Sequence, residues 1–439
     1  MLRRSLESAI GWWPYFQLTL TNARVCALAQ HRVPARRPRR RPTSRVRGYV
    51  LCWTYDPQRT GRNQIGRVSI RCRALQMDNG WILLDEPQRR PQGKEVATVW
   101  VVIVTYGERY MSLTAETLHR ALAADATGVT VVDNGLHPAH AAELDAAAAR
   151  DPRINVIKLG RNTGSAGGFR SGLRDALARA SDFILMLDDD NWISGDFIQK
   201  SLALHGTYGR LLGTNELAVL GNRTLDNNHQ RLVRGTPPRI TFPPPGAFLS
   251  FDLVTYMKRV FFHRSRRPFT EPVIVPSAPY GGLMVPATVV RRVGLPREDF
   301  FLYADDTEWS SRIHDAGVPI CFMPDCEVVD ADAKWSREAG KGPRGILRSP
   351  SLIRIYYGTR NQTFLERTML HTSGPRVRYA INRAIYFTFA YLIVISDPNI
   401  RHAQWSQFKT AVSDGDAGRL GEASQARIMG ETAYEDSLA

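Results

Sequence analysis

The acidic triplet Asp188–Asp190 is the first group of residues whose types and spacing suit a chemical role. It follows an apolar run directly, and two carboxylates one residue apart can share a hard divalent cation whose other ligands are phosphate oxygens and water. A cation held in this way neutralises charge that develops on a diphosphate leaving group. The alternative for an isolated Asp-x-Asp is a solvated acidic turn, so the surrounding sequence must decide between the two interpretations.

A second acidic group lies between Tyr303 and Arg312 and contains Asp305, Asp306 and Glu308. On a helix, Glu308 and Arg312 are four residues apart, which suits a salt bridge. Adjacent aspartates point in different directions, so one can face a substrate while the other anchors the start of the helix. A carboxylate in a partly dry cleft is a credible general base. The alternative is an acidic helix N-terminus that the helix dipole favours.

Three glycines, Gly164, Gly167 and Gly168, precede a predicted helix and allow close approach to the backbone. Such a turn at a helix N-terminus suits an anionic or sugar–phosphate ligand, or it is a plain glycine-rich turn. The dinucleotide fingerprint Gly-x-Gly-x-x-Gly is absent here, and no Gly-Lys-Ser/Thr follows. Asp133 can accept hydrogen bonds from a nucleobase or ribose, or it caps a turn.

Apolar periodicity predicts the elements that position these residues. The continuous β-branched run Val99–Val104 is typical of a strand buried on both faces. We predict further strands at Val129–Val132, Ile154–Lys158 and Phe183–Leu187, and helices around Ser112–Ala124 and Phe169–Ala180. Right-handed crossovers between such elements give a mostly parallel, doubly wound α/β sheet. We expect residues 221–248 to be irregular, regular structure to resume near Gly281, and amphipathic helices beyond Leu352.

Polar residues follow each of the four predicted strands, at the point where the strand ends. In an open parallel sheet, ligands bind at the carboxyl ends of the strands. The segments at this edge are Thr105–Arg109, Asp133–Gly135, Arg161–Gly168 and Asp188–Asn191. Their convergence predicts a single site. No Ser/His/Asp or Cys/His signature of nucleophilic catalysis stands out.

The net charge of +16 belongs to the start of the chain. Residues 1–95 hold 19 Lys and Arg against 6 Asp and Glu, most densely from Arg32 to Arg47. Such an arm attracts nucleic acid or an anionic membrane, or it is a solvated tail. We divide the chain into a basic, poorly ordered extension at 1–95 with a small β appendage, a catalytic domain at 96–350, and a helical region at 351–439.

Composition excludes two classes of protein. With 43% apolar residues the chain can bury a core, which excludes wholesale disorder. No apolar run reaches the roughly 20 residues of a spanning helix, which excludes a polytopic membrane protein. The five cysteines form no Cys-x-x-Cys pair, which favours a reducing, cytoplasmic location. The run Ala384–Ile395 lies either at the inner face of the plasma membrane, as a peripheral contact, or in an ordinary buried helix.

The order of these motifs resembles the family 2 glycosyltransferases of GT-A fold, from about Trp100 to Arg360. The resemblance is strongest to the branch of rhamnosyl- and galactofuranosyltransferases, for which an Asp-Asp-x-Glu-Trp/Phe-Ser run is typical. The matching segments are 104–109, 131–135, 162–168, 187–191, 281–286, 293–301 and 305–312, the last of which includes Glu308, Trp309 and Arg312. The segment Tyr356–Asn361 is similar to the Tyr-Tyr-x-x-Arg-Asn found near the end of such enzymes.

The resemblance implies a role for each matched residue. Asp188 and Asp190 would bind Mg²⁺ or Mn²⁺, and Asp306 would be the catalytic base, with Asp305 as the second choice. The implied donor-binding residues are Thr105, Tyr106, Asp133, Asn134, Asn162, Gly164, Gly167, Gly168 and Asp188. The implied reaction is a single displacement with inversion, in which the base takes the proton of the acceptor hydroxyl.

One position departs from the pattern of this branch. Its members often supply a metal-binding His on the strand after the base helix, whereas this chain has Asp330 and Asp332 there. Either aspartate can replace the His as an oxygen ligand for a hard ion. Otherwise the third ligand is lost, or the two aspartates simply end a strand.

The resemblance therefore implies a transferase of polysaccharide biosynthesis. It would move a rhamnose- or galactofuranose-like sugar from a UDP- or dTDP-linked donor to a glycan or polyprenyl-linked acceptor. A sugar-nucleotide pyrophosphorylase would want an early Gly-Gly-x-Gly-x-Arg-Leu loop, which is missing. The other alternative is a nucleic-acid- or membrane-binding protein that acts through the arginine arm on an inert scaffold. It leaves the strand-end motifs unexplained, so we do not expect nucleic acid as a partner.

Overall fold

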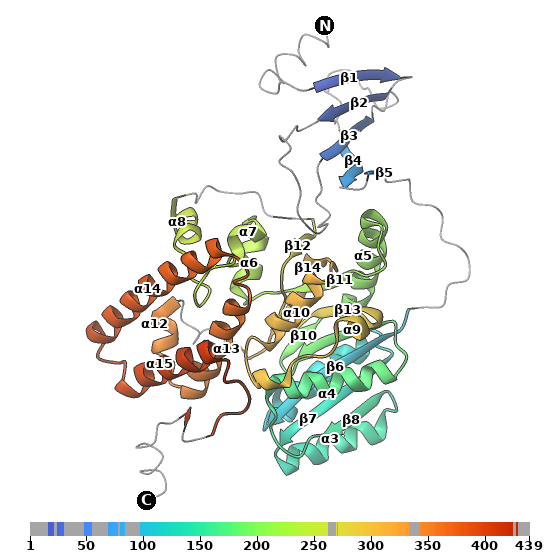
Figure 1. The fold of residues 1–439 in the computed structure, drawn as a ribbon. Helices are drawn as coiled ribbons and strands as arrows, with labels where there is room; N and C mark the ends of the chain where they lie inside the picture. Colours follow the sequence, from blue (N-terminus) through green and yellow to red (C-terminus); the bar gives the residue numbers. More distant parts are fainter. Residues whose placement is uncertain are drawn as a thin grey trace, which may run out of the picture. The chain divides into compact units, whose positions relative to one another are not determined.

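The structure is a computed structural model of the 439-residue chain (Figure 1). It describes residues 16–21, 24–29, 48–54, 69–77, 80–83, 97–261, 269, 271–332, 342–424 and 427–428. The chain forms two compact units, Met1–Glu95 and Val96–Ala439. The arginine run from Arg32 to Arg47 lies outside the described residues, so the expected arm stays a prediction.

The described residues of the first unit form a five-stranded antiparallel sheet in the order β1-β2-β3-β4-β5. Its strands are β1 (Phe16–Thr21), β2 (Arg24–Ala29), β3 (Gly48–Thr54), β4 (Ser69–Met77) and β5 (Gly80–Leu83). All five strands lie within residues 1–95, the part of the chain in which we expected a small β appendage.

The second unit is built on a nine-stranded sheet in the order β10-β14-β11-β13-β9-β6-β7-β8, with β12 paired to β14. The strands are β6 (Val99–Gly107), β7 (Gly128–Leu136), β8 (Ile154–Lys158), β9 (Phe183–Asp188), β10 (Asn191–Ile193), β11 (Ala218–Arg223), β12 (Val273–Val275), β13 (Leu283–Pro286) and β14 (Ile320–Asp330). The four strands predicted from apolar runs are all present.

Strand directions bring six carboxyl ends to one edge of this sheet. Strands β8, β7, β6 and β9 are parallel neighbours. Strand β13 is antiparallel to both β9 and β11, and β11 is parallel to β14. Strands β11 and β14 therefore run in the same direction as β9. The α/β class with a parallel core is confirmed, and the mixed half of the sheet adds two further strand ends to the predicted site edge.

Helices cover both faces of the sheet, as a doubly wound fold requires. One face packs against α4 (Gly164–Ala178), α9 (Ala287–Val293) and α10 (Asp305–Asp315), and the other against α2 (Ala115–Ala123), α3 (Pro138–Arg150) and α5 (Phe197–Leu212). Helix α4 lies so close to the sheet that a Cβ on Gly172 would come within 2.3 Å of Val102 Cγ1. The small residue is what permits this approach.

The structure differs from the expected elements at three places. Helix α3 was not predicted, because its alanine-rich sequence lacks an apolar stripe and Leu144 is its one buried side chain. Residues 221–248 are not simply irregular, because they contain the end of β11 and the short helices α6 (Asn227–Val233) and α7 (Pro238–Thr241). Regular structure also returns before Gly281, with α8 (Leu253–Phe261) and β12.

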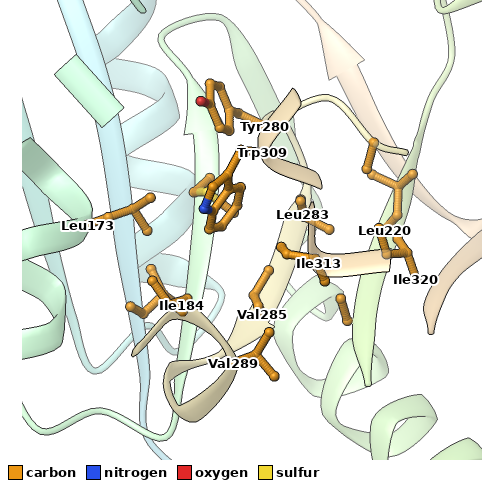
Figure 2. Packing of buried hydrophobic residues seen from close by; sticks show 14 of the residues in the cluster. Leu173, Ile184, Leu220, Tyr280, Leu283, Val285, Val289, Trp309, Ile313 and Ile320 are labelled. Atoms are coloured by element: carbon orange, nitrogen blue, oxygen red, sulfur yellow. The ribbon is translucent and has the colours of Figure 1, made fainter. Parts of the chain in front are cut away.

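Trp309 fixes α10 to the sheet. Its ring is fully buried, and its indole N–H donates to the carbonyl oxygen of Gly294 at 2.7 Å. Figure 2 shows the ring among side chains from several elements that are distant in sequence, including Leu173, Ile184 and Leu283. A helix anchored by so large a buried ring cannot shift without opening the core, so the residues at its N-terminus have a fixed position.

The C-terminal part of the chain is helical, as expected. Its helices are α12 (Gly342–Leu347), α13 (Leu352–Thr368), α14 (Ser373–Ser396) and α15 (His402–Ala417). They enclose a separate aromatic core in which Phe248 packs edge-on to Tyr379 and Tyr386, and Tyr386 stacks on Phe408. The apolar run that begins at Ala384 is the second half of α14, a helix of 24 residues.

Candidate active site

The acidic triplet lies at the turn between β9 and β10. The side chain of Asn191 organises this turn, because its Oδ1 accepts from the backbone N–H of Asp188 at 3.0 Å and its Nδ2 donates to Asp330 Oδ1 at 3.0 Å. The backbone N–H of Ala331 donates to the carbonyl oxygen of Asp190 at 2.9 Å. The end of β14 is thereby joined to the triplet, and four carboxylates, Asp188, Asp189, Asp190 and Asp330, share one small region.

Two arginines neutralise much of this negative charge. Arg223, the last residue of β11, is 3.0 Å from Asp188 Oδ2 and 2.6 Å from Asp330 Oδ1. Arg109 binds Asp189, and its Nη1 lies 3.0 Å from Asp332 Oδ2. Neither arginine was predicted to have a role in the site. Arg109 follows the first strand within a recognisable motif, whereas nothing near Arg223 in sequence marks it.

The remaining negative charge shows in the pKa values. Burial raises the pKa of Asp188 to about 6 against the attraction of Arg223, and the charges of Asp189 and Asp330 add to the rise. Burial and the charge of Asp188 raise the pKa of Asp190 to about 6 as well. Carboxylates that repel one another in this way favour a bound cation. Oxygen donors of this type fit Mg²⁺ or Mn²⁺.

No three acidic, imidazole or thiol groups in the described part of the chain are arranged to enclose a metal ion as they stand. Asp330 and Asp332 are each paired with an arginine. The set Asp188, Asp190, Asp330 and Asp332 therefore stays a prediction. In this arrangement Arg223 holds Asp330 in an ion pair where the sequence pattern suggested a third metal ligand.

The two adjacent aspartates of the second group have different surroundings. Asp305 is 2% exposed and accepts a hydrogen bond from Ser165 Oγ at 3.0 Å, so it fixes the start of α10 against α4. Asp306 is more open, and its Oδ1 accepts from the backbone N–H of Thr307 at 2.6 Å. Burial raises the pKa of both carboxyls, and the charge of Asp306 raises the pKa of Asp305 further. The geometry gives Asp305 the anchoring position and Asp306 the open one.

A strained turn delivers these aspartates to the site. Phe301, Tyr303 and Ala304 have φ angles of +62°, +70° and +58°. Residues other than glycine seldom adopt this backbone conformation. Asn361 of α13, which is fully buried, donates through Nδ2 to the carbonyl oxygens of Phe300, Leu302 and Tyr303 at 2.8–2.9 Å. These hydrogen bonds hold the turn in its unusual shape.

Arg360 supports the same turn from the neighbouring position. It is 1% exposed, donates to the carbonyl oxygen of Phe300 at 3.1 Å, and lies over the rings of Tyr356 and Tyr357. The segment Tyr356–Asn361, singled out in the sequence without a stated role, is thus a clamp on the turn before α10.

Asp306 lines a cavity of about 450 Å³. Other polar groups on its wall include Asp226, His314, Gln362 and Glu366, and prolines 243–245 and 276 form apolar surface beside them. A second cavity of about 330 Å³ shares Ser250, Thr307 and Gln362 with the first. Both cavities lie between α10 and the C-terminal helices. Together they offer room for an elongated polar molecule.

The triplet and the Asp306 cavity are electrically coupled. The charge of Asp306 raises the pKa of Asp188, and the charge of Arg223 lowers the pKa of Asp306. Coulomb interactions of this kind act over short distances in proteins. The triplet itself does not line the cavity, so the link between the two groups is the interaction of their charges.

Several predicted donor-binding residues hold the local backbone. Asp133 Oδ1 accepts from the N–H groups of Gly135 and Leu136, at 3.1 and 2.7 Å. Asn134 accepts from Thr163 and donates to the carbonyl oxygen of Gly164, at 2.8 and 2.9 Å. The two bonds of Asp133 match the alternative in which this residue caps a turn. The bonds of Asn134 hold the segment that begins α4.

The other predicted donor residues lie along the same edge. Thr105 is buried and pairs with Thr114 Oγ1 at 2.7 Å, whereas Tyr106 is 38% exposed and stacks under Arg109. Asn162 Oδ1 accepts from the N–H of Gly164 at 2.8 Å. Gly164 has φ +74°, and a Cβ there would meet Phe301; Gly167 and Gly168 pack against Thr163 and Val104. The edge is brought together as predicted, and its role in binding stays a prediction.

Glu308, Trp309 and Arg312 stabilise α10. Glu308 Oε1 accepts from Arg312 Nε at 2.8 Å, which is the predicted i, i+4 pair. Arg312 also donates to the carbonyl oxygens of Val293 and Leu295 at 2.9 and 3.0 Å. These three residues support the helix that carries Asp306 and do not reach the cavity.

Comparisons with known proteins agree on one enzyme class. Residues 100–261 match the model of glycosyl transferase family 2. The chain is 26% identical over 271 residues to the dTDP-rhamnosyl transferase RfbF of Shigella flexneri, and the match covers 62% of this chain and 80% of that protein.

The solved structures to which the chain is similar include two nucleotide-sugar complexes. Residues 1–349 of TarS from S. aureus with UDP-GlcNAc match with a TM-score of 0.43 at 14% identity, over 76% of this chain and 82% of TarS 1–349. The mannosyltransferase PcManGT from Pyrobaculum calidifontis with GDP-Man and Mn²⁺ matches with a TM-score of 0.39 at 16% identity, over 73% and 86% of the two chains.

Removal of the charge on Arg223 should destabilise the folded protein. In Arg223→Met, Asp188 and Asp330 lose the guanidinium group that binds them both. We therefore expect the free energy of unfolding at pH 8 to fall by about 2 kcal/mol. The loss should shrink as the pH is lowered toward 6, because protonation removes the repulsion between the carboxylates. Urea unfolding at several pH values measures both effects.

The matched control is Arg292→Met, which breaks the exposed pair between Arg292 and Glu216. Exposed pairs of this kind contribute about 1 kcal/mol or less, so this variant should change little at any pH. An equal and pH-independent loss of unfolding free energy in both variants would show that Arg223 does not stabilise the carboxylates Asp188 and Asp330.

Proposed function

We propose that the chain is a family 2 glycosyltransferase of GT-A type, and that it is an inverting enzyme in which Asp306 is the general base. The observation that carries the proposal is the position of Asp306, which lines the cavity and whose charge raises the pKa of Asp188. A nucleotide sugar at the acidic edge and an acceptor in the cavity would then meet at this carboxylate.

The donor that we propose is a dTDP-linked deoxysugar of the rhamnose type. The rhamnosyl transferase of Shigella flexneri, to which this chain is similar over 271 residues, supports this choice. A UDP-linked sugar is the second candidate and belongs in the same screen. The diphosphate would lie at the end of β9, close to the glycine-bearing start of α4, whose N-terminal N–H groups favour an anion.

Asp188 and Asp190 would hold a divalent cation, Mg²⁺ or Mn²⁺, which supplies charge neutralisation at the diphosphate when it is bound. The fit rests on their oxygen donors and on the raised pKa of both groups. Arg223 binds Asp188 Oδ2, and Arg109 binds both carboxylate oxygens of Asp189, so the two arginines keep these carboxylates oriented.

The chemical step is a single displacement. Asp306 takes the proton from the acceptor hydroxyl as the hydroxyl oxygen bonds to the anomeric carbon of the sugar. The bond from that carbon to the diphosphate oxygen breaks at the same time, and its electron pair leaves with the nucleoside diphosphate. The anomeric configuration inverts because the oxygen enters opposite the leaving group, and no covalent intermediate with the protein is needed.

We propose a glycan as the acceptor, carried on a polyprenyl lipid or on a growing polysaccharide. The wall of the Asp306 cavity alternates hydrogen-bonding groups, such as Asn228 and Gln362, with rigid apolar surface from prolines 243–245. Sugar rings present the same combination of hydroxyl groups and apolar C–H faces. The family match favours this enzymatic function over an inert scaffold with a basic arm.

Asn361 is a positioning residue in this proposal. It does not touch the cavity, but it fixes the three carbonyl oxygens of the turn that presents Asp306. A base displaced by about 1 Å can lose 10²-fold in rate, so the clamp contributes to kcat through geometry.

Asp306→Asn tests the base directly. We expect kcat to fall by about 10²–10⁴-fold with little change in donor KM, because the amide cannot accept the proton. Activity of the unmutated enzyme should also fall as the pH drops through the raised pKa of Asp306, since only the ionised carboxylate acts as a base. Nucleoside diphosphate release, with and without Mn²⁺, measures turnover for each donor.

Asp305→Asn and Asp145→Asn are the comparisons for this test. Asp305 faces Ser165, so its substitution should reduce activity less than that of Asp306. Asp145 is an exposed residue of α3 that pairs with Lys158, and its substitution should have no effect. Equal turnover of Asp306→Asn and the unmutated enzyme would refute the assignment, and a larger loss in Asp305→Asn would transfer the role to Asp305.

Asn361→Ser tests the clamp. The shorter side chain cannot reach three carbonyl oxygens, so we expect kcat to fall about tenfold or more while donor KM stays the same. Gln404→Ala removes another buried amide, which donates to the carbonyl oxygen of Ser349 at 2.8 Å and not to the carbonyl oxygens of the turn. Similar stability losses in both variants with a kcat loss in Asn361→Ser alone support the role; matching kcat values would overturn it.

A further inference from the structure

Helix α14 presents an apolar face to solvent along most of its length. The exposed fractions are 60% for Val377, 53% for Ile381, 53% for Phe389, 55% for Tyr391, 49% for Leu392 and 63% for Ile395. The helix has 24 residues, so at 1.5 Å per residue it is about 36 Å long. Exposed apolar side chains are ordinary when scattered singly, but a continuous stripe of this length marks an interaction surface.

The opposite face of α14 is fixed to the rest of the chain. Its buried residues are Tyr379, Asn382, Tyr386 and Ala390, at helical spacing. Asn382 Nδ2 donates to the carbonyl oxygen of Gly246 at 2.8 Å. The exposed stripe is therefore one side of a docked amphipathic helix, and about half or more of each of its apolar side chains stays exposed, although the ring of Tyr391 also contacts Trp405.

Helix α8 extends this apolar surface. Leu253, Val254, Tyr256 and Met257 are between 36% and 53% exposed. The residue before the helix, Asp252, binds Arg378 of α14 at 2.6 Å, and Asn382 Oδ1 accepts from the N–H of Leu253 at 3.1 Å. Figure 1 shows α8 beside one end of α14. We call the exposed side chains of these two helices the α8–α14 surface.

The charge around this surface is positive. Neither helix contains an Asp or a Glu. Residues 342–417 hold ten Lys and Arg against four Asp and Glu. Two arginines of α14 are already bound to acids, Arg378 to Asp252 and Arg383 to Asp416, whereas Arg376 and Lys258 are exposed. An apolar stripe with basic residues at its margin is complementary to the interface of an anionic bilayer.

We propose that the α8–α14 surface docks the enzyme on an anionic lipid bilayer, with the apolar stripe at the level of the headgroups. The proposal rests on the proposed function, because a membrane-bound acceptor gives the enzyme a reason to be there. It also gives a physical basis for the expected location at the inner face of the plasma membrane.

The structure favours docking over spanning. By length and composition α14 is long and apolar enough to cross a bilayer. Spanning would bury Arg378 and Arg383 in hydrocarbon or strip them from Asp252 and Asp416, and charges at the bilayer centre are costly. Docking keeps these ion pairs and leaves only the already exposed stripe in contact with lipid.

The α8–α14 surface is joined to the cavity that Asp306 lines. Gly246 and Ser250 are on the cavity wall, and Gly246 is hydrogen-bonded to Asn382 of α14. Glu366, also on the wall, accepts from the N–H groups of Leu249 and Ser250 at 2.7 Å. A lipid-linked glycan rising from the bilayer beside α14 would thus reach the wall of this cavity first.

Vesicle flotation of the full chain tests the proposal. The vesicles contain phosphatidylcholine and phosphatidylglycerol in equal parts. The test variant is Leu392→Glu with Ile395→Glu, which places two charges on the stripe without altering a buried residue. We expect its partition onto vesicles to fall about tenfold or more, because burial of two such side chains contributes at least that factor. At about 1 M salt, where the screening length is about 3 Å, the unmutated chain should still float.

The matched control is Leu211→Glu with Ile274→Glu. These residues are 37% and 45% exposed on α5 and β12, so the control makes the same change of charge away from α8 and α14. The arginine-rich extension is present in every protein, so a difference between the variants reports on the stripe. The control should float like the unmutated chain.

The outcomes that overturn the proposal are distinct. Equal flotation of both variants and the unmutated chain excludes docking through this surface. Retention after an alkaline carbonate wash indicates a spanning helix. A dimer that sedimentation finds for the unmutated chain, and that the test variant loses, makes a second copy the occupant. Nucleoside diphosphate release with a soluble acceptor should be the same in all three proteins, which separates failure of docking from failure of the proposed function.

Discussion

The pairing of arginine with aspartate at one sheet edge is the interaction on which the rest of the site depends. Three carboxylates in sequence at the end of β9, with Asp330 beside them, would repel one another and open the edge. Arg223 prevents this by binding Asp188 and Asp330 together. Because β11 and β14 run in the same direction as β9, the ends of three strands meet at one guanidinium, and the mixed half of the sheet becomes part of the site.

A second constraint, on the turn before α10, fixes the position of Asp306, the proposed base. The turn before α10 has three residues with positive φ, which is unfavourable unless other groups hold it. Asn361 does so from α13, and Trp309 prevents the helix from moving away from the sheet. The C-terminal helices therefore do more than extend the molecule. They hold the turn before α10 and form one wall of the cavity that Asp306 lines. One of them, α14, also carries part of the α8–α14 surface proposed to dock on a bilayer.

Local pattern was enough to predict the parallel core of the fold. Buried strands such as Val99–Val104 can be predicted from sequence because a run of β-branched residues fits few other environments. The acidic groups at 188–190 and 305–306 were found because residues close in sequence carry them. Arg223 and Asn361 were assigned no role, since each acts on residues distant in sequence and their type alone carries no signal. Helix α3 was missed because alanine favours a helix without marking a face.

One bound donor should touch both acidic groups, Asp188–Asp190 and Asp306. A crystal structure with Mn²⁺ and a non-hydrolysable analogue of the nucleotide sugar measures this most directly. We expect anomalous density for the metal at Asp188 and Asp190, and the anomeric carbon directed toward Asp306. A metal bound elsewhere, or a sugar with Asp306 on the far side of the diphosphate, would contradict the account.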